Sequence, residues 1–383
     1  MRISLISSSF HPYPGGVEEH TRHVARELVA RGHEVVVWTV DRGEHLGVRT
    51  VDGIIVRYLP TPLPARQAGA LARAALTVPS ALVKWLAAYR DDRPEILNVQ
   101  CFGPNGVYAQ AVAALTRTPL VISAHGETFM DDHSLFDESA LARTALRRGL
   151  RRADVVTGAS ELVLDDLRAR FGLTGGDVVA NGVDLNEPER LRGGGDRVDK
   201  EPTTIVAVGR VERVKGFDLL LDAFAASGLA AEGARLVIGG DGGALADLIK
   251  KAADLGITDT VEFPGRLDRR GVIDLMTRAG VVVVPSRREA FGIVALEAWR
   301  AGAVLVATSL GGPATFVRDG VDGLIVDPTD STALGSALRR AVDDGELAAR
   351  LSQAGRDRVT EFTWDRVAAD YEKVFARARA RRR

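Results

Sequence analysis

The sequence predicts an α/β protein with two consecutive domains, each built on a parallel sheet. The chain has 383 residues, and at about 100–200 residues per domain this length favours two domains. Its 46% hydrophobic and 26% charged residues are typical of a globular protein. Short β-branched runs alternate with helical segments along both halves, which indicates β-α-β units with right-handed crossovers.

The first domain is expected over residues 1–185. An apolar run at Ile3–Ser7 leads through a Gly-Gly turn into a helical pattern at Val17–Arg31, which Gly32 ends. The next strand is Glu34–Thr39. Further strands are predicted at Ile54–Leu59, Ile96–Val99, Leu120–Ser123, Val155–Thr157 and Val178–Ala180, with helices near 70–90, 106–117, 139–152 and 160–170.

A polar segment at 186–203, rich in Gly and without periodicity, is predicted to be the interdomain linker. The second domain, 204–363, repeats the alternation, and 364–383 forms one more helix with a basic end. Strands are predicted at Thr204–Val208, Leu236–Gly239, Val261–Pro264, Val281–Val284, Val304–Ala307 and Gly323–Val326, and helices near 216–226, 243–255, 270–279, 291–301, 331–342 and 346–360. We therefore expect two Rossmann-like domains whose parallel sheets face each other across a cleft that holds the ligands.

Composition excludes several classes of protein. The 50 Lys and Arg residues balance 51 Asp and Glu residues, so no excess positive charge favours nucleic-acid binding. Cys101 is the single cysteine, which excludes intrachain disulfides and multi-cysteine metal sites. No apolar run approaches the ~20 residues of a membrane helix, and the first residues contain no signal-peptide core. We expect a cytoplasmic protein.

The most informative motif is PSRREAFGIVALEAWRAG at 285–302. Glu289 lies in the loop after a predicted strand, and Glu297 lies about two turns into a helix that should begin near Phe291. Carboxylates accept hydrogen bonds from sugar hydroxyls, and the N–H groups of a first helical turn bind phosphate. The motif indicates a nucleotide-sugar site; the alternative is a solvated helix with ordinary glutamates.

Three weaker motifs also follow strands. In GRVERVKG (209–216), Arg210 and Lys215 are placed to neutralise a diphosphate, unless this is only a charged surface loop. In PGGVEEH (14–20), Gly15 and Gly16 lead into a helix N-terminus that suits an anion. In SAHGE (123–127), His125 either donates to a substrate hydroxyl or is a buried structural histidine.

Two other patterns carry less weight. His20 and His23 have no third metal ligand nearby and are predicted to lie on a helix surface. The sequence contains no HExxH, GxSxG or Asp-x-Asp motif, so a departing diphosphate would depend on Arg210, Lys215 and helix N-termini rather than on a metal.

Taken together, the motifs resemble glycosyltransferase family 4, retaining enzymes of the GT-B fold. The match runs in order through PGGVEEHTRHVARELVARGHEV, NGVD (181–184), GRVERVKGFDLLLDAF (209–224), IGGDGG (238–243), VEFPGRL (261–267) and the 285–302 motif. The resemblance implies that the final helix crosses back to the first domain and that no metal or other cofactor takes part.

The resemblance also implies residue roles. Glu289 would contact the donor hexose and Glu297 the nucleotide ribose, while Arg210 and Lys215 would hold the diphosphate. His125 would lie beside the transferred sugar, and with Arg210, Lys215 and Glu289 it forms the predicted catalytic set. Gly16 would lie near the diphosphate or the acceptor. The remaining predicted donor-binding residues are Arg266 and Leu267 against the base, and Phe291, Gly292, Ile293 and Val294 at the helix start.

The predicted reaction moves a hexose from a nucleotide sugar to an acceptor hydroxyl with retained configuration, through a front-face mechanism. A UDP-sugar is the expected donor and a GDP-sugar the next choice. The rival functions are a nucleotide-sugar epimerase on the same scaffold and a non-catalytic nucleotide-sugar sensor. An epimerase would act on the donor without any acceptor, whereas a sensor would show no turnover.

The acceptor, a small molecule or a lipid, is assigned to the first domain. The segments 60–69 and 128–134 are expected to form its walls, with Gly15, Gly16, Glu127 and Asp131 as acceptor-binding candidates. The arginine-rich helix at 143–152 suggests peripheral contact with anionic lipid, but a solvated face is the favoured alternative. The sequence does not define the oligomeric state.

Overall fold

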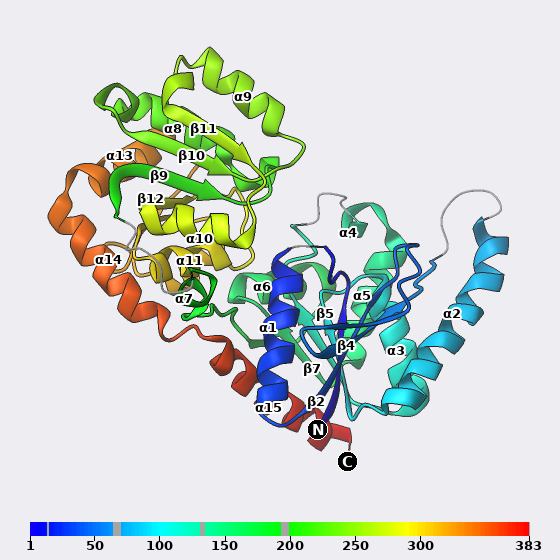
Figure 1. The fold of residues 1–383 in the computed structure, drawn as a ribbon. Coiled ribbons are helices and arrows are strands. Elements are labelled where there is room, and N and C mark those ends of the chain that lie inside the picture. Colours follow the sequence, from blue (N-terminus) through cyan, green and yellow to red (C-terminus); the bar gives the residue numbers. More distant parts are fainter. Residues whose placement is uncertain (14, 64–69, 131–134, 193–198, 383) are drawn as a thin grey trace. The chain divides into compact units, whose positions relative to one another are not determined.

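The computed structural model describes residues 1–13, 15–63, 70–130, 135–192 and 199–382 (Figure 1). The chain divides into two compact units. Unit 1 consists of Met1–Asn181 together with Trp364–Arg383, and unit 2 consists of Gly182–Thr363. Each unit has its own sheet, so the predicted two-domain α/β class is confirmed.

Unit 1 contains an eight-stranded sheet in the order β3-β4-β2-β1-β5-β6-β7-β8. Every pairing is parallel except that of β3 with β4, which is antiparallel. The central strands β1, β5 and β6 are buried along their whole length except at Arg2, as expected of strands covered on both faces. The strands are β1 (Arg2–Ser7), β2 (Glu34–Val40), β3 (Val48–Val51), β4 (Ile54–Leu59), β5 (Ile96–Gln100), β6 (Leu120–Ala124), β7 (Val155–Gly158) and β8 (Asp177–Val178).

The helices of unit 1 include one from the far end of the chain. α15 (Trp364–Arg382) runs beside α1 (Gly16–Ala30) and contacts β5, β6 and β7 (Figure 1). Its buried residues Trp364, Val367, Tyr371 and Val374 recur at helical spacing and form one apolar stripe. The others are α2 (Ala70–Asp92), α3 (Pro104–Thr116), α4 (Leu135–Glu138), α5 (Ala140–Arg152) and α6 (Glu161–Phe171).

Unit 2 contains a six-stranded, wholly parallel sheet in the order β11-β10-β9-β12-β13-β14. Its strands are β9 (Glu201–Val208), β10 (Arg235–Gly239), β11 (Val261–Gly265), β12 (Ala279–Val284), β13 (Val304–Thr308) and β14 (Leu324–Val326). The α-helices are α7 (Glu187–Arg192), α8 (Phe217–Ser227), α9 (Leu245–Asp254), α10 (Arg269–Arg278), α11 (Ile293–Ala301), α12 (Pro313–Phe316), α13 (Ser331–Asp343) and α14 (Gly345–Val359), and the 3-10 turns are η1 (Arg213–Lys215), η2 (Leu229–Glu232) and η3 (Thr258–Thr260).

Both sheets have a topological switch point, where successive strands begin to add on the opposite side. In unit 2 the chain adds β10 and β11 on one side of β9 and then places β12 on the other side. In unit 1 the same reversal occurs between β1 and β5. Loops that leave the carboxyl ends of the two strands at such a point diverge, and ligands of open α/β sheets bind in the crevice they form.

The structure departs from the predicted organisation at the 186–203 segment. Glu187–Arg192 form helix α7, and β9 already begins at Glu201. The break between the units comes earlier, after Asn181. The polar composition of this segment was misleading because α7 uses its charges inside unit 2, where Glu187 is 7% exposed. The edge strand β3 was also missed, since its four residues are mostly exposed.

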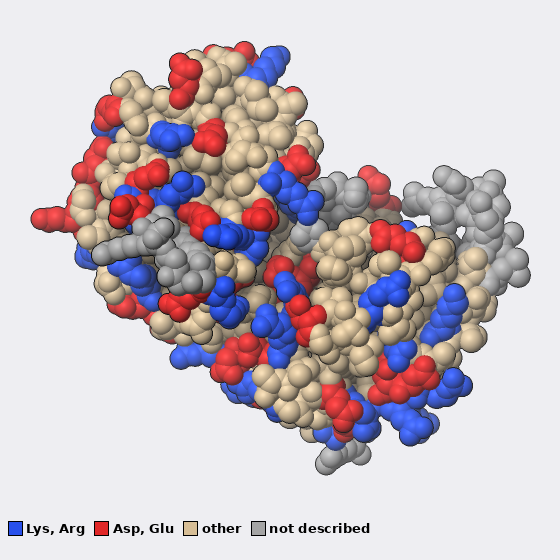
Figure 2. Space-filling model, viewed as in Figure 1, with Lys and Arg blue, Asp and Glu red and all other residues tan. Residues whose placement is uncertain are grey.

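On the face shown in Figure 2, acidic and basic side chains are interspersed and form no large area of one sign. Helix α5 carries the arginines considered for lipid contact, but its Leu146 and Leu150 are buried in unit 1. Arg143 donates to the carbonyl oxygens of Phe136 and Asp137. Within the described part of the chain, no helix combines the length and the apolar character needed to span a bilayer.

Candidate active site

Lys215 and Glu289 come together at the switch point of the unit 2 sheet. Lys215 follows β9, and Glu289 follows β12, the neighbouring strand. The Lys215 Nζ atom lies 2.8 Å from Glu289 Oε2, and Ser286 Oγ donates to the same oxygen at 2.9 Å. The side chains are 19% and 9% exposed. Sequence analysis predicted this convergence, although it did not single out Ser286.

The backbone fixes the two loops against each other. Gly216 has φ +69°, and a Cβ atom there would lie 2.0 Å from the carbonyl oxygen of Pro285, so only glycine permits this approach. Arg287 N donates to Val214 O at 2.9 Å, and the Arg287 guanidinium binds both oxygens of Asp218 at 2.6 and 2.7 Å. This bidentate ion pair locks the Glu289 loop to the start of α8.

The helix that follows Glu289 begins two residues later than predicted. Gly292, at φ +92°, precedes α11 and provides no side-chain cap. The leading N–H groups of α11, at Ile293 and Val294, therefore lie at the positive end of the helix without a side-chain cap. Phe291 is buried and stacks on Phe316, with ring centroids 4.7 Å apart, which anchors the loop just before this turn.

The remaining predicted donor residues lie on neighbouring loops of unit 2. Arg210 is exposed in the loop after β9, where Gly209 N donates to Gly239 O at 3.0 Å. Arg266 is exposed and Leu267 is half-buried after β11, so both follow a strand of the same sheet edge. Leu267 packs against Gly239, where an added Cβ would lie 2.9 Å from Leu267 Cδ1.

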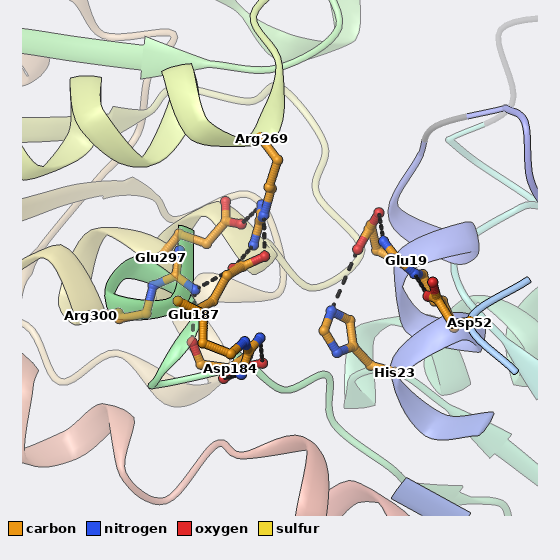
Figure 3. A network of polar contacts seen from close by, with 10 residues as sticks. Glu19, His23, Asp52, Asp184, Glu187, Arg269, Glu297 and Arg300 are labelled. Carbon is orange, nitrogen blue, oxygen red and sulfur yellow. Dashed lines mark hydrogen bonds and ion pairs between the residues drawn. The ribbon is translucent and has the colours of Figure 1, made fainter. Parts of the chain in front are cut away.

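Glu297 belongs to a separate charged cluster, shown in Figure 3, in which Arg269 lies between two glutamates. Arg269 Nη1 binds Glu297 Oε1, and its Nε and Nη2 atoms lie 2.8 and 2.5 Å from the two oxygens of Glu187. Arg300 Nη1 approaches Glu187 Oε2 at 2.7 Å. Burial alone would raise the pKa of Glu187, but Arg269 and Arg300 hold it at about 2.

The cluster gives Glu297 a partner that its spacing in the sequence did not reveal. Glu297 is 5% exposed, and Arg269 occupies its Oε1 atom. Sequence reasoning missed both Arg269 and Glu187. A signal was available, because Arg269 opens helix α10, where a cation opposes the helix dipole unless it has an acidic partner.

In unit 1, His125 follows β6 and joins a buried chain of hydrogen bonds. His125 Nε2 lies 2.7 Å from Gln100 Oε1, and Tyr371 Oη of α15 donates to the same oxygen at 3.3 Å. Tyr371 Oη also lies 3.0 Å from His20 Nε2, whose other ring nitrogen is 2.6 Å from Asn181 Oδ1. The C-terminal helix thus contributes directly to the surroundings of His125.

The amide contacts define the His125 tautomer. Gln100 Nε2 donates to Asn98 Oδ1 at 2.6 Å, which turns Gln100 Oε1 toward the histidine. His125 Nε2 therefore carries the proton and Nδ1 is an acceptor. Burial lowers the pKa of His125 to about 4, so the ring is neutral at pH 7. We expected His125 to donate to a substrate hydroxyl, but this tautomer makes Nδ1 a hydrogen-bond acceptor.

The predicted acceptor residues have different environments. Gly15 and Gly16 lie at the start of α1, and open space surrounds the position of a Cβ on Gly16. Glu127 is committed to the backbone, since it accepts from Phe102 N and His125 N, each at 2.7 Å. It shapes the His125 loop, which leaves little capacity for an amine. Asp131 and the segments 64–69 and 131–134 lie outside the described residues.

The prediction that His20 and His23 form a helix surface is wrong. They are 0% and 6% exposed, because α15 covers this side of α1. His23 stacks on Trp364 at a centroid distance of 4.9 Å, and its Nε2 lies 3.5 Å from Glu19. The described residues include no group of three or more His, Cys, Asp or Glu side chains that could hold a metal.

Comparisons with known proteins agree with this architecture. The family model Glycosyltransferase Family 4 matches residues 14–187, and the model Glycosyl transferases group 1 matches residues 195–358. A glycogen synthase of Mycobacterium tuberculosis is 30% identical, with 99% of this chain and 95% of that protein covered. The D-inositol 3-phosphate glycosyltransferase 1 of Catenulispora acidiphila is also 30% identical, covering 96% and 93%.

A solved structure supports the fold. Anabaena Alr3699/HepE in complex with UDP superimposes with a TM-score of 0.75, at 19% identity, over 98% of this chain and 100% of that one. At this identity the match bears on the fold alone. The relatives that are 30% identical over almost their whole length show more than the fold. The chain belongs to glycosyltransferase family 4, has its two-domain α/β GT-B fold, and is a glycosyltransferase.

Proposed function

We propose that this enzyme transfers a hexose from a nucleotide sugar to an acceptor hydroxyl with retention of configuration. The observation that carries the proposal is the Lys215–Glu289 pair beside the open N-terminus of α11, at the switch point of the unit 2 sheet. A cation and free N–H groups suit a diphosphate, and the adjacent carboxylate suits sugar hydroxyls. The relative solved with UDP favours a UDP-sugar, with a GDP-sugar as the next choice.

The donor roles follow from the contacts in unit 2. Lys215 and Arg210 would neutralise the diphosphate together with the N–H groups of Ile293 and Val294. Glu289 would accept from hydroxyls of the hexose, since Lys215 and Ser286 already hold its carboxylate in position. Arg269 engages Oε1 of Glu297, so the Oε2 atom would accept from the ribose. The loop with Arg266 and Leu267 would border the base.

The proposed chemistry is a front-face substitution. The bond between the anomeric carbon and the diphosphate oxygen breaks while the acceptor oxygen bonds to the same face of that carbon. The acceptor proton passes to a departing diphosphate oxygen, so no carboxylate serves as nucleophile. Lys215 stabilises the charge that develops on the leaving group. His125, neutral and protonated on Nε2, would accept a hydrogen bond on Nδ1 from a substrate hydroxyl.

We further propose that no metal or cofactor takes part. The sequence lacks an Asp-x-Asp motif, and the cations of unit 2 supply positive charge for the leaving group. Turnover should persist in excess EDTA. Complete loss of activity in EDTA, restored by Mg²⁺ or Mn²⁺, would contradict this part of the proposal.

Two measurements test the proposed function. Thermal-shift assays with UDP, GDP and ADP should single out one nucleotide, because a ligand at a hundred times its Kd adds about 2.7 kcal/mol of stability. Product analysis by NMR with the matching nucleotide sugar should then show a new glycoside with the donor's anomeric configuration. An epimerised nucleotide sugar formed without acceptor would overturn transfer, and an inverted product would overturn retention.

A further inference from the structure

Unit 1 contains an apolar cavity that the proposed chemistry does not use. Its volume is about 480 Å³, within the ~300–1,000 Å³ range of small-molecule sites. Three helices line it: α2 through Leu82, α3 through Val107 and Ala111, and α5 through Ala142 and Ala145. Phe102, in the loop after β5, also lines it.

The cavity offers a ligand almost no hydrogen bonds. Among the described residues that line it, only Tyr108 and Ser139 have polar side chains. Tyr108 Oη donates to Pro62 O at 2.7 Å, and Ser139 Oγ accepts from Ala142 N at 3.2 Å as the cap of α5. A sugar or inositol ring placed here would lose its hydration without compensation, which costs free energy. A hydrocarbon group would lose nothing by entering.

The cavity is joined to the His125 loop through one carboxylate. Phe102 lies two residues beyond β5, and its N–H donates to Glu127 Oε1 at 2.7 Å. The other oxygen of Glu127 accepts from His125 N at 2.7 Å. Burial raises the pKa of Glu127, and the two N–H groups oppose that shift. The apolar wall and His125 are therefore held together at the switch-point end of the unit 1 sheet.

We propose that this cavity binds the hydrocarbon part of an amphiphilic acceptor, an alcohol that carries an alkyl or prenyl chain. The chain would lie between α2, α3 and α5, and the hydroxyl-bearing end would emerge beside His125. The proposal deepens the proposed function and rests on it for the identity of the ligand as acceptor. It separates this enzyme from one that glycosylates a fully polar acceptor such as D-inositol 3-phosphate.

The first test measures binding without turnover. Hexyl, octyl and decyl β-D-glucoside, each kept below its critical micelle concentration, are titrated calorimetrically into the full-length protein, with glucose as the chainless control. Kd should fall about fourfold per methylene until the cavity is full, the equivalent of about 0.8 kcal/mol each. Equal affinity across the series, or no binding at all, overturns the proposal.

A matched pair of variants locates the binding. Ala111 lines the cavity from α3, whereas Ala114 on the same helix is exposed and does not line it. A111W should weaken octyl glucoside binding at least tenfold, and A114W should leave it unchanged. Should A111W fail to fold, A145F fills the cavity from α5 instead. An equal loss in A114W would overturn the assignment to this cavity.

Transfer assays separate this proposal from the proposed function. Transfer to alkyl glucosides, with KM falling as the chain lengthens, supports both. Chain-length-dependent binding without transfer from any nucleotide sugar supports the apolar cavity and counts against the proposed function. Transfer to polar acceptors, together with a KM for alkyl glucosides that does not change with chain length, supports the proposed function and overturns the hydrocarbon site.

Discussion

The Lys215 ammonium group pairs with Glu289 in the structure, and in the proposed mechanism it would face the diphosphate of the donor. Replacing Lys215 with Ala removes one charge-stabilising donor from the transition state. We expect kcat to fall about 10²–10³-fold, the usual effect of losing such a donor. Steady-state kinetics with the nucleotide sugar chosen by thermal shift measure this.

The matched control for Lys215 is Lys251, whose Nζ makes an ion pair of the same 2.8 Å length with Asp222 on the surface. Lys251→Ala removes an equal charge from unit 2 but should leave kcat within twofold. Near-normal turnover of Lys215→Ala would remove this residue from the mechanism, and equal losses in both variants would point to a general electrostatic effect.

His125 makes stability depend on pH. Its pKa is about 4 in the folded protein against 6.5 when unfolded, because burial disfavours the charged ring. Below pH 6.5 the unfolded chain binds the proton first, so stability is full above pH 6.5 and falls as the pH drops toward 4. When the pH falls from 7 to 5, this histidine should lower the free energy of unfolding by about 2 kcal/mol.

Denaturant titrations at pH 7 and pH 5 measure this loss of unfolding free energy in the wild type and in His125→Gln, and the two losses are compared. His125→Gln keeps an N–H donor toward Gln100 but does not titrate, so its pH-dependent loss should be smaller than that of the wild type by about 2 kcal/mol. Burial also lowers the pKa of His20, and the neighbouring His125 lowers it further, so His125→Gln reduces the His20 contribution as well and does not offset the expected difference. His45 is 88% exposed, and His45→Gln should leave the wild-type loss intact.

Helix α15 packs on unit 1 through its apolar stripe and also joins the hydrogen bonds around His125. It does so through Tyr371, whose buried hydroxyl contacts Gln100 and His20. Tyr371→Phe retains the ring and the apolar stripe but leaves two buried polar groups short of a partner. We expect a loss of about 1–3 kcal/mol in unfolding free energy. Tyr89→Phe, which removes a partly buried hydroxyl bonded to Thr118 at 3.0 Å, is the control.

The kcat of Tyr371→Phe distinguishes a positioning role of the hydroxyl from a role in packing alone. Without the Tyr371 hydroxyl, Gln100 is held less firmly and the His125 ring loses its fixed orientation, so kcat should fall while the donor KM stays constant. Tyr89→Phe should change neither constant. A Tyr371→Phe enzyme with wild-type kcat would limit α15 to a structural role.

The parallel strands and long helices of both units could be predicted because each has a strong local signal. Val281–Val284 is an uninterrupted β-branched run, and the Gly-Gly turn at 15–16 is followed by helical spacing. The Lys215–Glu289 pair also followed from position, since both residues come after neighbouring strands. Arg269, Glu187, Gln100 and Tyr371 did not, because the contacts that join them to the two sites span 25 to 351 positions along the chain and no local pattern encodes such contacts.

For the whole molecule, the sequence located two domains but not the point where the chain leaves the first. Polarity pointed to 186–203, whereas the packing changes after Asn181. The side chain of Asn181 bonds to buried His20, and the ring of Trp364 lies 5.5 Å from the same histidine. The two residues that flank unit 2 in the chain, Asn181 and Trp364, thus both contact His20 in unit 1.

This arrangement predicts how the chain can be divided. Residues 182–363 are continuous and enclose their own core, around Ile205, Phe224 and Val283. That fragment should fold cooperatively and be stabilised by UDP, by about 2.7 kcal/mol at a hundred times Kd. Residues 1–181 alone should be unstable, because the surface that buries Val367 and Phe375 of α15 would be exposed.

Joining residues 364–383 to Asn181 through a short glycine-serine linker should restore a folded unit 1, since both junctions lie beside His20. Circular dichroism and thermal scans with and without UDP test the three proteins side by side. The fused unit 1 should show no UDP-dependent shift. A UDP-dependent shift in the fused unit 1, together with none in 182–363, would show that the nucleotide binds unit 1. Lys215 and Glu289 would then not belong to the donor site.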